Sequence, residues 1–131
     1  MTSIIRNISV DCADLWALAS FWSRVLDRPL DPDSNEGDDE VGVILPNGTE
    51  LLFLAGPEPK RIKNRLHLCL EPDIMRDDEV ERILALGAAL QADRRADDGT
   101  GWAVLQDPEG NEFCVLRSKG ERAEGTLAMD V

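Results

Sequence analysis

The chain has 131 residues, of which 43% are hydrophobic and 31% are charged, as expected for one folded domain rather than a disordered chain. It contains no run of about 18 apolar residues, so we expect no transmembrane helix, and the first residues do not resemble a signal peptide. Acidic residues outnumber basic ones by 26 to 14, giving a net charge of −12. This charge repels nucleic-acid phosphates and anionic lipid surfaces, which argues against both as partners.

Strand and helix signals alternate in the first half. Residues 4–12 alternate in polarity as a half-buried strand does. Asp14 is a typical helix N-cap, and apolar residues at helical spacing predict a helix over residues 15–27 that buries Trp22. Trp16 lies on the opposite side of this helix, where it is exposed or contacts a second subunit. Residues 31–40 carry many carboxylates without the EF-hand pattern, so they predict a solvated loop and no calcium site.

A hairpin and a second strand–helix unit follow. Asn47-Gly48 separates the apolar runs 41–45 and 50–55, which is a strong hairpin signal. After a linker over 56–64, residues 65–71 alternate, with Leu66, Leu68 and Leu70 on one face and Arg65, His67, Cys69 and Glu71 on the other.

The rest of the second half repeats this order. A helix is predicted near 76–87, with Gly87 as the glycine that ends it, and a short strand over 90–95. Strands at 101–106 and 111–117 are joined by a turn at Pro108–Gly110. Nothing regular is predicted for the C-terminal tail, residues 118–131.

The three cysteines, Cys12, Cys69 and Cys114, lie in apolar or alternating stretches without CxxC spacing. An odd number without that spacing predicts neither a disulfide framework nor a zinc ribbon. Cys12 and Cys69 belong to faces in different layers, so no disulfide is expected between them. We expect buried, reduced thiols in a cytoplasmic protein.

The two halves of the chain are similar to each other. An offset of 62 residues aligns GTELLFL (48–54) with GNEFCVL (110–116), and an offset of 60 aligns NISVD (7–11) with HLCLE (67–71). Each half therefore reads as a βαβββ module of about 55 residues. Neither half has enough core to be stable alone, so we expect the modules to pack together.

The sequence resembles the vicinal oxygen chelate superfamily, which includes glyoxalase I, bleomycin-resistance proteins and extradiol dioxygenases, and within it the glyoxalase-like subfamily. The resemblance rests on KNRLHLCLE (63–71), LALGA (84–88) and VLQDPEGNEFCVL (104–116), in order and correctly spaced, and it covers residues 4–117. It implies an α+β fold in which two βαβββ modules, 4–55 and 64–117, curl mixed sheets around a concave cavity that holds a small molecule.

The resemblance also implies four metal-ligand positions, on the first and last strand of each half. These positions are normally His, Gln or Glu, but here they hold Asn7, Leu52, His67 and Cys114. Leucine cannot ligate a metal, and an amide binds one weakly. Zinc could accept His67 and Cys114, yet two protein ligands rarely hold a metal tightly. We therefore expect no catalytic metal and no cofactor.

Several roles remain open for the site residues. His67 is either a hydrogen-bonded structural residue or a cavity residue that binds a ligand or acts as a general acid or base. Cys114 could act as a nucleophile through His67, although apolar neighbours would raise its pKa. Trp102 either lines the pocket or packs in the core.

We expect a cytoplasmic protein that binds a small apolar or aromatic molecule without a metal, with Asn7, Leu52, His67, Trp102 and Cys114 around it. The resemblance to bleomycin-resistance proteins allows simple sequestration, and a homodimer is expected because one half-cavity usually needs a second module to complete it. The alternative is a lyase, isomerase or dioxygenase that uses a divalent metal at His67. A third class, a protein-interaction module, would need a filled cavity.

Overall fold

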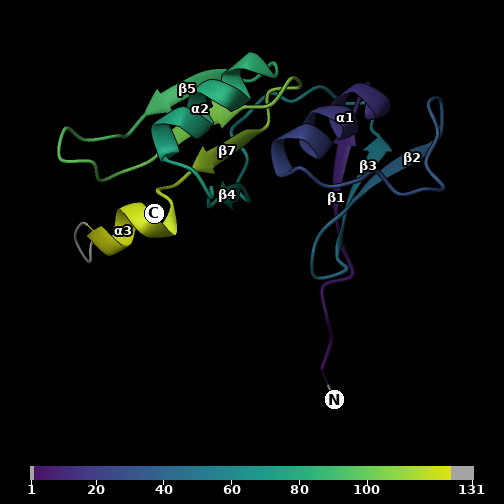
Figure 1. The fold of residues 1–131 in the computed structure, drawn as a ribbon. Coiled ribbons are helices and arrows are strands. Elements are labelled where there is room, and N and C mark those ends of the chain that lie inside the picture. The colour runs from purple at the N-terminus through teal and green to yellow at the C-terminus, as the bar shows by residue number, and fades with distance from the viewer. Residues whose placement is uncertain (1, 125–131) are drawn as a thin grey trace. The chain divides into compact units, whose positions relative to one another are not determined.

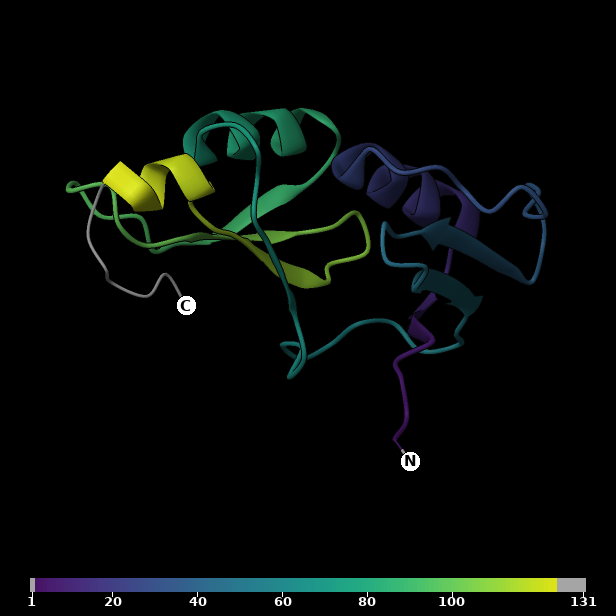
Figure 2. The same cartoon turned by 60° about the horizontal axis from the view of Figure 1, so that its bottom comes forward.

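The computed structural model describes residues 2–124, and the chain divides into two compact units, residues 1–60 (unit 1) and 61–131 (unit 2). Each unit has a small mixed β-sheet with a helix on one face (Figures 1 and 2). This confirms the predicted α+β class with two mixed sheets. Within the described residues, no helix is both long and apolar enough to cross a bilayer.

Unit 1 contains β1 (Asn7–Cys12), α1 (Leu15–Leu26), β2 (Glu40–Ile44) and β3 (Glu50–Ala55). The strand order is β1-β3-β2, with β1 parallel and β2 antiparallel to β3. The predicted hairpin between β2 and β3 is confirmed, because the Gly48 amide donates to the Leu45 carbonyl at 2.9 Å. Gly48 has a φ of 88°, which a glycine adopts without strain.

The predicted first helix is confirmed to within one residue. The Asp14 carboxylate accepts the Ala17 amide at 3.2 Å and so caps the N-terminus. The chain leaves α1 at Asp27, whose φ of 50° is left-handed. Its apolar stripe, including Leu18 and Trp22, is buried and packs on β2 and β3. Each such side chain contributes roughly 1.5–3 kcal/mol to folding.

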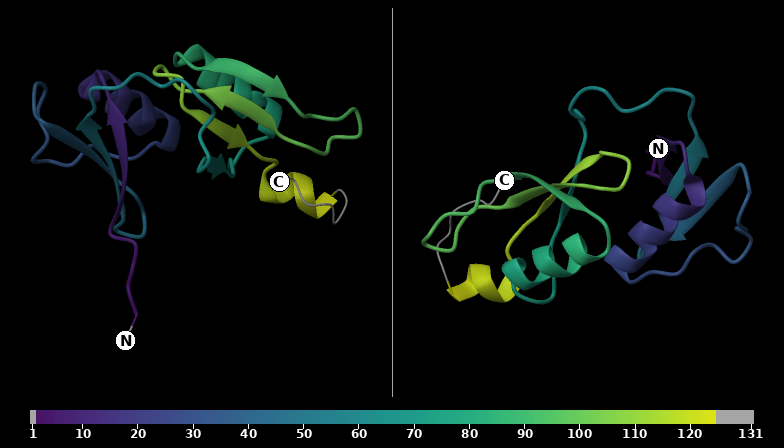
Figure 3. Two further views of the ribbon diagram at one scale, coloured as in Figure 1. Left: turned by 180° about the vertical axis from the view of Figure 1, so that it is seen from behind. Right: turned by 90° about the horizontal axis from the view of Figure 1, so that it is seen from above.

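Unit 2 contains β4 (Leu68–Leu70), α2 (Arg76–Ala85), β5 (Ala89–Asp93), β6 (Ala103–Gln106), β7 (Glu112–Val115) and α3 (Lys119–Glu124). The strand order is β4-β7-β6-β5, with β4 parallel to β7 and the other pairs antiparallel. Both views of Figure 3 show α2 against one face of this sheet. Val80 and Ile83 of α2 and Phe113 of β7 are buried in this layer.

The second predicted turn and helix end are also confirmed. The Gly110 amide donates to the Asp107 carbonyl at 2.9 Å, and the Asp107 carboxylate accepts the Asn111 amide at 3.0 Å. Gly87 has a φ of 120° and follows Leu86, the C-cap of α2.

The prediction of four strands in each half is wrong for unit 1, which forms three among its described residues. The place equivalent to β5 is reduced to one β-bridge between Leu30 and Val43. Pro29 and Pro32 flank Leu30 and have no amide hydrogen to donate to a sheet. The polar residues that follow, 33–40, offer no apolar side chain to hold a longer strand against the core.

The predicted strand over 65–71 is shortened, because β4 pairs with β7 only from Leu68 to Leu70. Leu66, expected on the buried leucine face, is 92% exposed. The expectation that all thiols are buried is also wrong, since Cys69 is exposed whereas Cys12 and Cys114 are buried.

The tail also differs from expectation, because α3 begins directly after Ser118. The Ser118 hydroxyl accepts the Glu121 amide at 3.2 Å, while the Glu121 carboxylate accepts the Ser118 amide at 2.9 Å. This reciprocal pair is a capping box. The same carboxylate accepts the Arg76 amide at 2.7 Å, which ties α3 to the start of α2. Residues 125–131 of the predicted tail lie outside the described residues.

Candidate functional site

Each sheet has one face covered by its own helix and one face that this helix leaves uncovered, here called the open face. Successive strand residues point to opposite faces. In unit 1, Leu51 and Phe53 are buried on the helix face, which places Glu50 and Leu52 on the open face. Strand register then aligns Asn7 with Glu50 and Ser9 with Leu52.

The open face of unit 1 has a shallow depression of about 430 Å³ beside Leu52. Its polar lining is almost entirely acidic: Asp31, Asp33, Asp38, Asp39, Glu40 and Glu50. A hydrogen bond with Asp31, then partial burial and the charges of Asp31 and Glu40, raise the pKa of Glu50 above its usual value. These groups therefore repel one another and attract positive charge.

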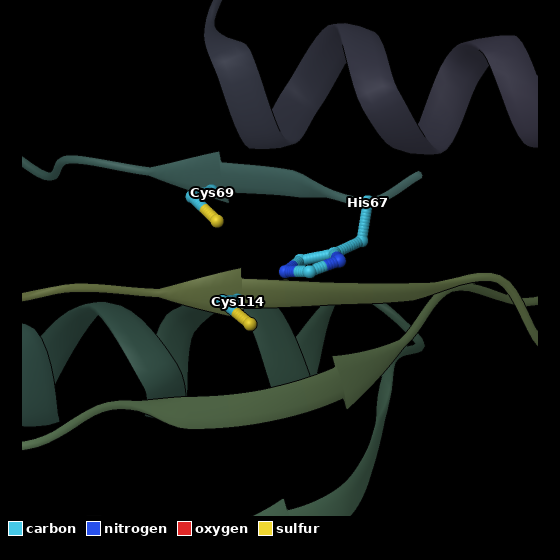
Figure 4. Close-up of side chains that lie close together, drawn as sticks. All are labelled: His67, Cys69 and Cys114. Atoms are coloured by element: carbon cyan, nitrogen blue, oxygen red, sulfur yellow. The ribbon is translucent and has the colours of Figure 1, made fainter. Parts of the chain in front are cut away.

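The open face of unit 2 carries His67, Cys69 and Cys114. Cys69 lies directly opposite Cys114 in the parallel β4–β7 pair, and His67 precedes Cys69 by two residues, which returns its side chain to the same face. Figure 4 shows all three side chains on this face, with the imidazole between the two strands. The ligand atoms of the three side chains all lie within 4.8 Å of one another.

The two thiols differ in environment. Cys114 is only 4% exposed, whereas Cys69 is open to solvent. Burial, followed by the proximity of Cys69, raises the pKa of the Cys114 thiol to about 11, although Lys63 acts in the opposite direction. Cys114 is therefore a neutral thiol at pH 7. This counts against the nucleophile role considered from the sequence, because the thiolate is the nucleophile.

The expected site residues fall into two groups. Asn7 and Leu52 lie on the open face of unit 1, and His67 and Cys114 lie on that of unit 2. Trp102 is half-buried just before β6, where its carbonyl accepts the Arg94 amide at 2.9 Å. Its assignment to a pocket wall stays a prediction.

Sequence reasoning missed the contribution of Cys69 to this site. Its alternation with His67 was visible, but only the strand register reveals that it lies opposite Cys114. Sequence reasoning also missed Arg76, whose buried guanidinium donates to the carbonyls of Gly99, Thr100 and Gly101 at 2.8–3.2 Å. A charged residue at the start of a helix gives no sign of such a distant contact.

Residues 7–116 match the glyoxalase-like domain family. The chain belongs to this family. A comparison with curated protein sequences finds no match.

Solved structures of the glyoxalase/bleomycin resistance/dioxygenase superfamily share the fold. The oxidase ChaP-H2 is 25% identical, with a TM-score of 0.63 over 89% of this chain and 94% of that one. A superfamily enzyme from Burkholderia phytofirmans PsJN is 21% identical, with a TM-score of 0.66 over 86% and 97%. A variant of the fosfomycin resistance protein FosX from Listeria monocytogenes, complexed with Mn(II) and 1S,2S-dihydroxypropylphosphonic acid, is 19% identical, with a TM-score of 0.68 over 95% and 98%.

The Mn(II) in that FosX complex makes it possible to test whether the residues here fit such an ion. Manganese is a hard cation that prefers oxygen ligands and imidazole. At the four positions implied by the family resemblance, unit 1 offers a hydrocarbon, Leu52, and the amide of Asn7, whose nitrogen donates to Ser9 at 2.7 Å. Unit 2 offers His67 and the sulfur of Cys114. This donor set does not fit manganese.

Proposed function

We propose that the protein binds a small apolar or aromatic molecule on its open faces and needs no hard catalytic cation. The observation that carries the proposal is Leu52, a half-buried hydrocarbon at a position where the family resemblance places a metal ligand. A leucine there favours contact with carbon atoms of a guest over a hydrated cation.

The remaining residues of the proposed site offer a few polar groups to the guest. Among the described residues, the imidazole of His67 has no hydrogen-bond partner, so it can donate to or accept from a guest. The neutral thiol of Cys114 adds a weakly polar wall. Asn7 and Trp102 complete the proposed set, as an amide and an aromatic surface.

The acidic depression of unit 1 indicates which charge the guest can carry. Asp31, Glu40 and Glu50 border Leu52, and no basic residue lines this depression among the described residues. We therefore propose a neutral or cationic guest, since an anion would meet repulsion there.

We also propose that the protein acts in the cytoplasm as a homodimer, with a second copy completing the binding cavity. Ile4 and Ile5, which precede β1, are 86% and 72% exposed, and exposed apolar residues of this kind are common where subunits meet. Light scattering coupled to size-exclusion chromatography tests this directly. A monomer at micromolar concentration would contradict it.

The experiment for the binding function is NMR on the isotope-labelled full chain after treatment with a chelator. Aromatic and cyclic aliphatic fragments are added in neutral, cationic and anionic sets. We expect neutral or cationic fragments to shift the amides of Asn7, Leu52, His67, Trp102 and Cys114. No shifts, or shifts confined to other surfaces, would contradict the proposal.

A fragment that binds then allows a test of His67. His67→Ala should weaken its binding by roughly 1–3 kcal/mol, because a buried polar group of the guest loses its partner. Asn64→Ala, close in sequence but outside the proposed set, is the control. If binding or turnover instead required a metal and ended on chelation, the metal-dependent enzyme reading would replace this one.

A further inference from the structure

The cluster of His67, Cys69 and Cys114 has properties that the binding function does not require. The sequence provides two recognisable ligands in this half, and two are too few to hold a metal tightly. The strand register adds a third, because it sets Cys69 opposite Cys114. One imidazole and two sulfurs now lie on one face of one unit (Figure 4).

We propose that His67, Cys69 and Cys114 bind a zinc ion, with water in the fourth position. Nitrogen and sulfur are the ligands that zinc prefers, and zinc sites with three protein ligands keep an open position. The donor set selects against manganese, magnesium and calcium, which prefer oxygen. Zinc would take one ring nitrogen of His67 and leave the other for a hydrogen bond to a guest. Leu52, in unit 1, is not involved.

The spacing of the donor atoms suits such an ion. In a tetrahedral site with bonds of about 2.0–2.3 Å, ligand atoms lie roughly 3.3–3.8 Å apart. The three atoms here lie within 4.8 Å of one another, so the distances between them need to shorten by at most about 1.5 Å. His67 and Cys69 are exposed and can turn toward the buried sulfur of Cys114.

Charge and access also favour binding. When the two sulfurs bind, the thiols release their protons, and the two thiolates balance the charge of Zn²⁺. Because His67 and Cys69 face solvent, an ion reaches the site without opening the core.

The test is a zinc titration of the reduced full chain, stripped of metal, in competition with a chromophoric chelator. We expect one Zn²⁺ per chain, and we expect Co²⁺ to give the intense near-ultraviolet absorption of thiolate coordination. Cys69→Ser and His67→Ala should each weaken zinc binding by at least about tenfold, since even outer-shell substitutions cost about 10- to 100-fold. Cys69 is exposed, and an unchanged circular dichroism melt will show that Cys69→Ser remains folded.

Two control variants make the result specific. Cys12→Ser removes the one cysteine outside the cluster and should leave zinc affinity unchanged. Asn7→Ala should also leave it unchanged, because the proposed ligands all belong to unit 2. The inference is overturned if wild type binds zinc no more tightly than Cys69→Ser, or if Asn7→Ala weakens zinc binding as much as Cys69→Ser does. No organic guest is present, so neither result depends on the proposed binding function.

Discussion

The two units share a strand order and a parallel pairing of their first and last strands. They differ in whether their carboxylates are paired with basic residues. Unit 1 contains four basic residues, Arg6, Arg24, Arg28 and Lys60, and its carboxylates gather around Glu50, whose pKa is raised. In unit 2, by contrast, arginines contact the carboxylates directly, and the pKa values of Asp77 and Asp93 are lowered.

The difference shows that the fold determines which face a strand residue occupies, but not the chemical character of its side chain. The open face of unit 1 combines Leu52 with mutually repelling carboxylates, and the open face of unit 2 combines an imidazole with two thiols. Equivalent strand positions therefore carry unrelated chemistry, and the family's metal-ligand positions cannot be assumed to keep their role.

The largest change in stability should come from Arg76→Met in unit 2. It removes a guanidinium that is 3% exposed and bonds three carbonyls of the 99–101 turn. We expect unit 2 to lose about 1.5–3 kcal/mol, the range for hydrogen bonds to a charged group. Hydrogen–deuterium exchange followed by mass spectrometry should show faster exchange in unit 2 with unit 1 unchanged.

Arg82→Met is the control for this prediction, because Arg82 is 41% exposed, whereas Arg76 is buried; its partner in the same helix, Glu79, is largely buried. We expect a cost of about 1 kcal/mol, at the upper end of the range for exposed ion pairs. Equal effects of the two substitutions would show that the buried contacts of Arg76 do not hold the turn.

A smaller change, a gain in stability, is expected from Glu50→Gln in unit 1. A carboxyl group whose pKa is raised by folding contributes stability at low pH, and that contribution is lost as the pH rises through the raised pKa. Glutamine can still hydrogen-bond Asp31 without adding a charge, although Arg6 nearby loses a partner charge. We expect a gain of roughly 0.5–1 kcal/mol at pH 7, which disappears near pH 4 in denaturant unfolding curves. A loss of stability at pH 7 would mean that Arg6 dominates this group.

The smallest effect should come from Asp93→Asn in unit 2. The side-chain and backbone hydrogen bonds of Arg95 lower the pKa of Asp93 from 3.8 to about 2. Its contribution is present above about pH 4 and is lost as the pH falls toward 2. Because Asp93 is 45% exposed, we expect only a few tenths of a kcal/mol. The acid limb of the unfolding profile should flatten in the variant, and 1 M salt should reduce the difference.

The fold could be predicted from the sequence wherever a capping or turn residue stood next to a run of apolar residues that the core buries. Asp14, Gly48 and Gly87 each marked a boundary through backbone chemistry that depends on a few neighbouring residues. A fourth strand in unit 1 would need apolar side chains and free amide groups to hold it at the edge of the sheet. The alternation of polar and apolar residues alone does not show whether these are present. The capping box at Ser118 and Glu121 is visible in the sequence, but the tail lacks the apolar period that would predict a helix.

The site was less predictable, because it depends on strand register. His67 and Cys114 followed from the family resemblance, but Cys69 gained its significance only from the residue opposite it. The acidic group around Leu52 likewise joins Asp31, next to the bridge at Leu30, with Glu50 of β3, and the loop between them gives no local signal of their proximity.

The proposed function requires that the residues at the family's metal-ligand positions bind no hard cation. It is tested most directly by titrating Mn²⁺ into the chelator-treated full chain and following the electron paramagnetic resonance of the free aqueous ion. The free-ion signal should stay undiminished at micromolar Mn²⁺ and equimolar protein. Loss of the signal at one Mn²⁺ per chain, restored by His67→Ala, would contradict it.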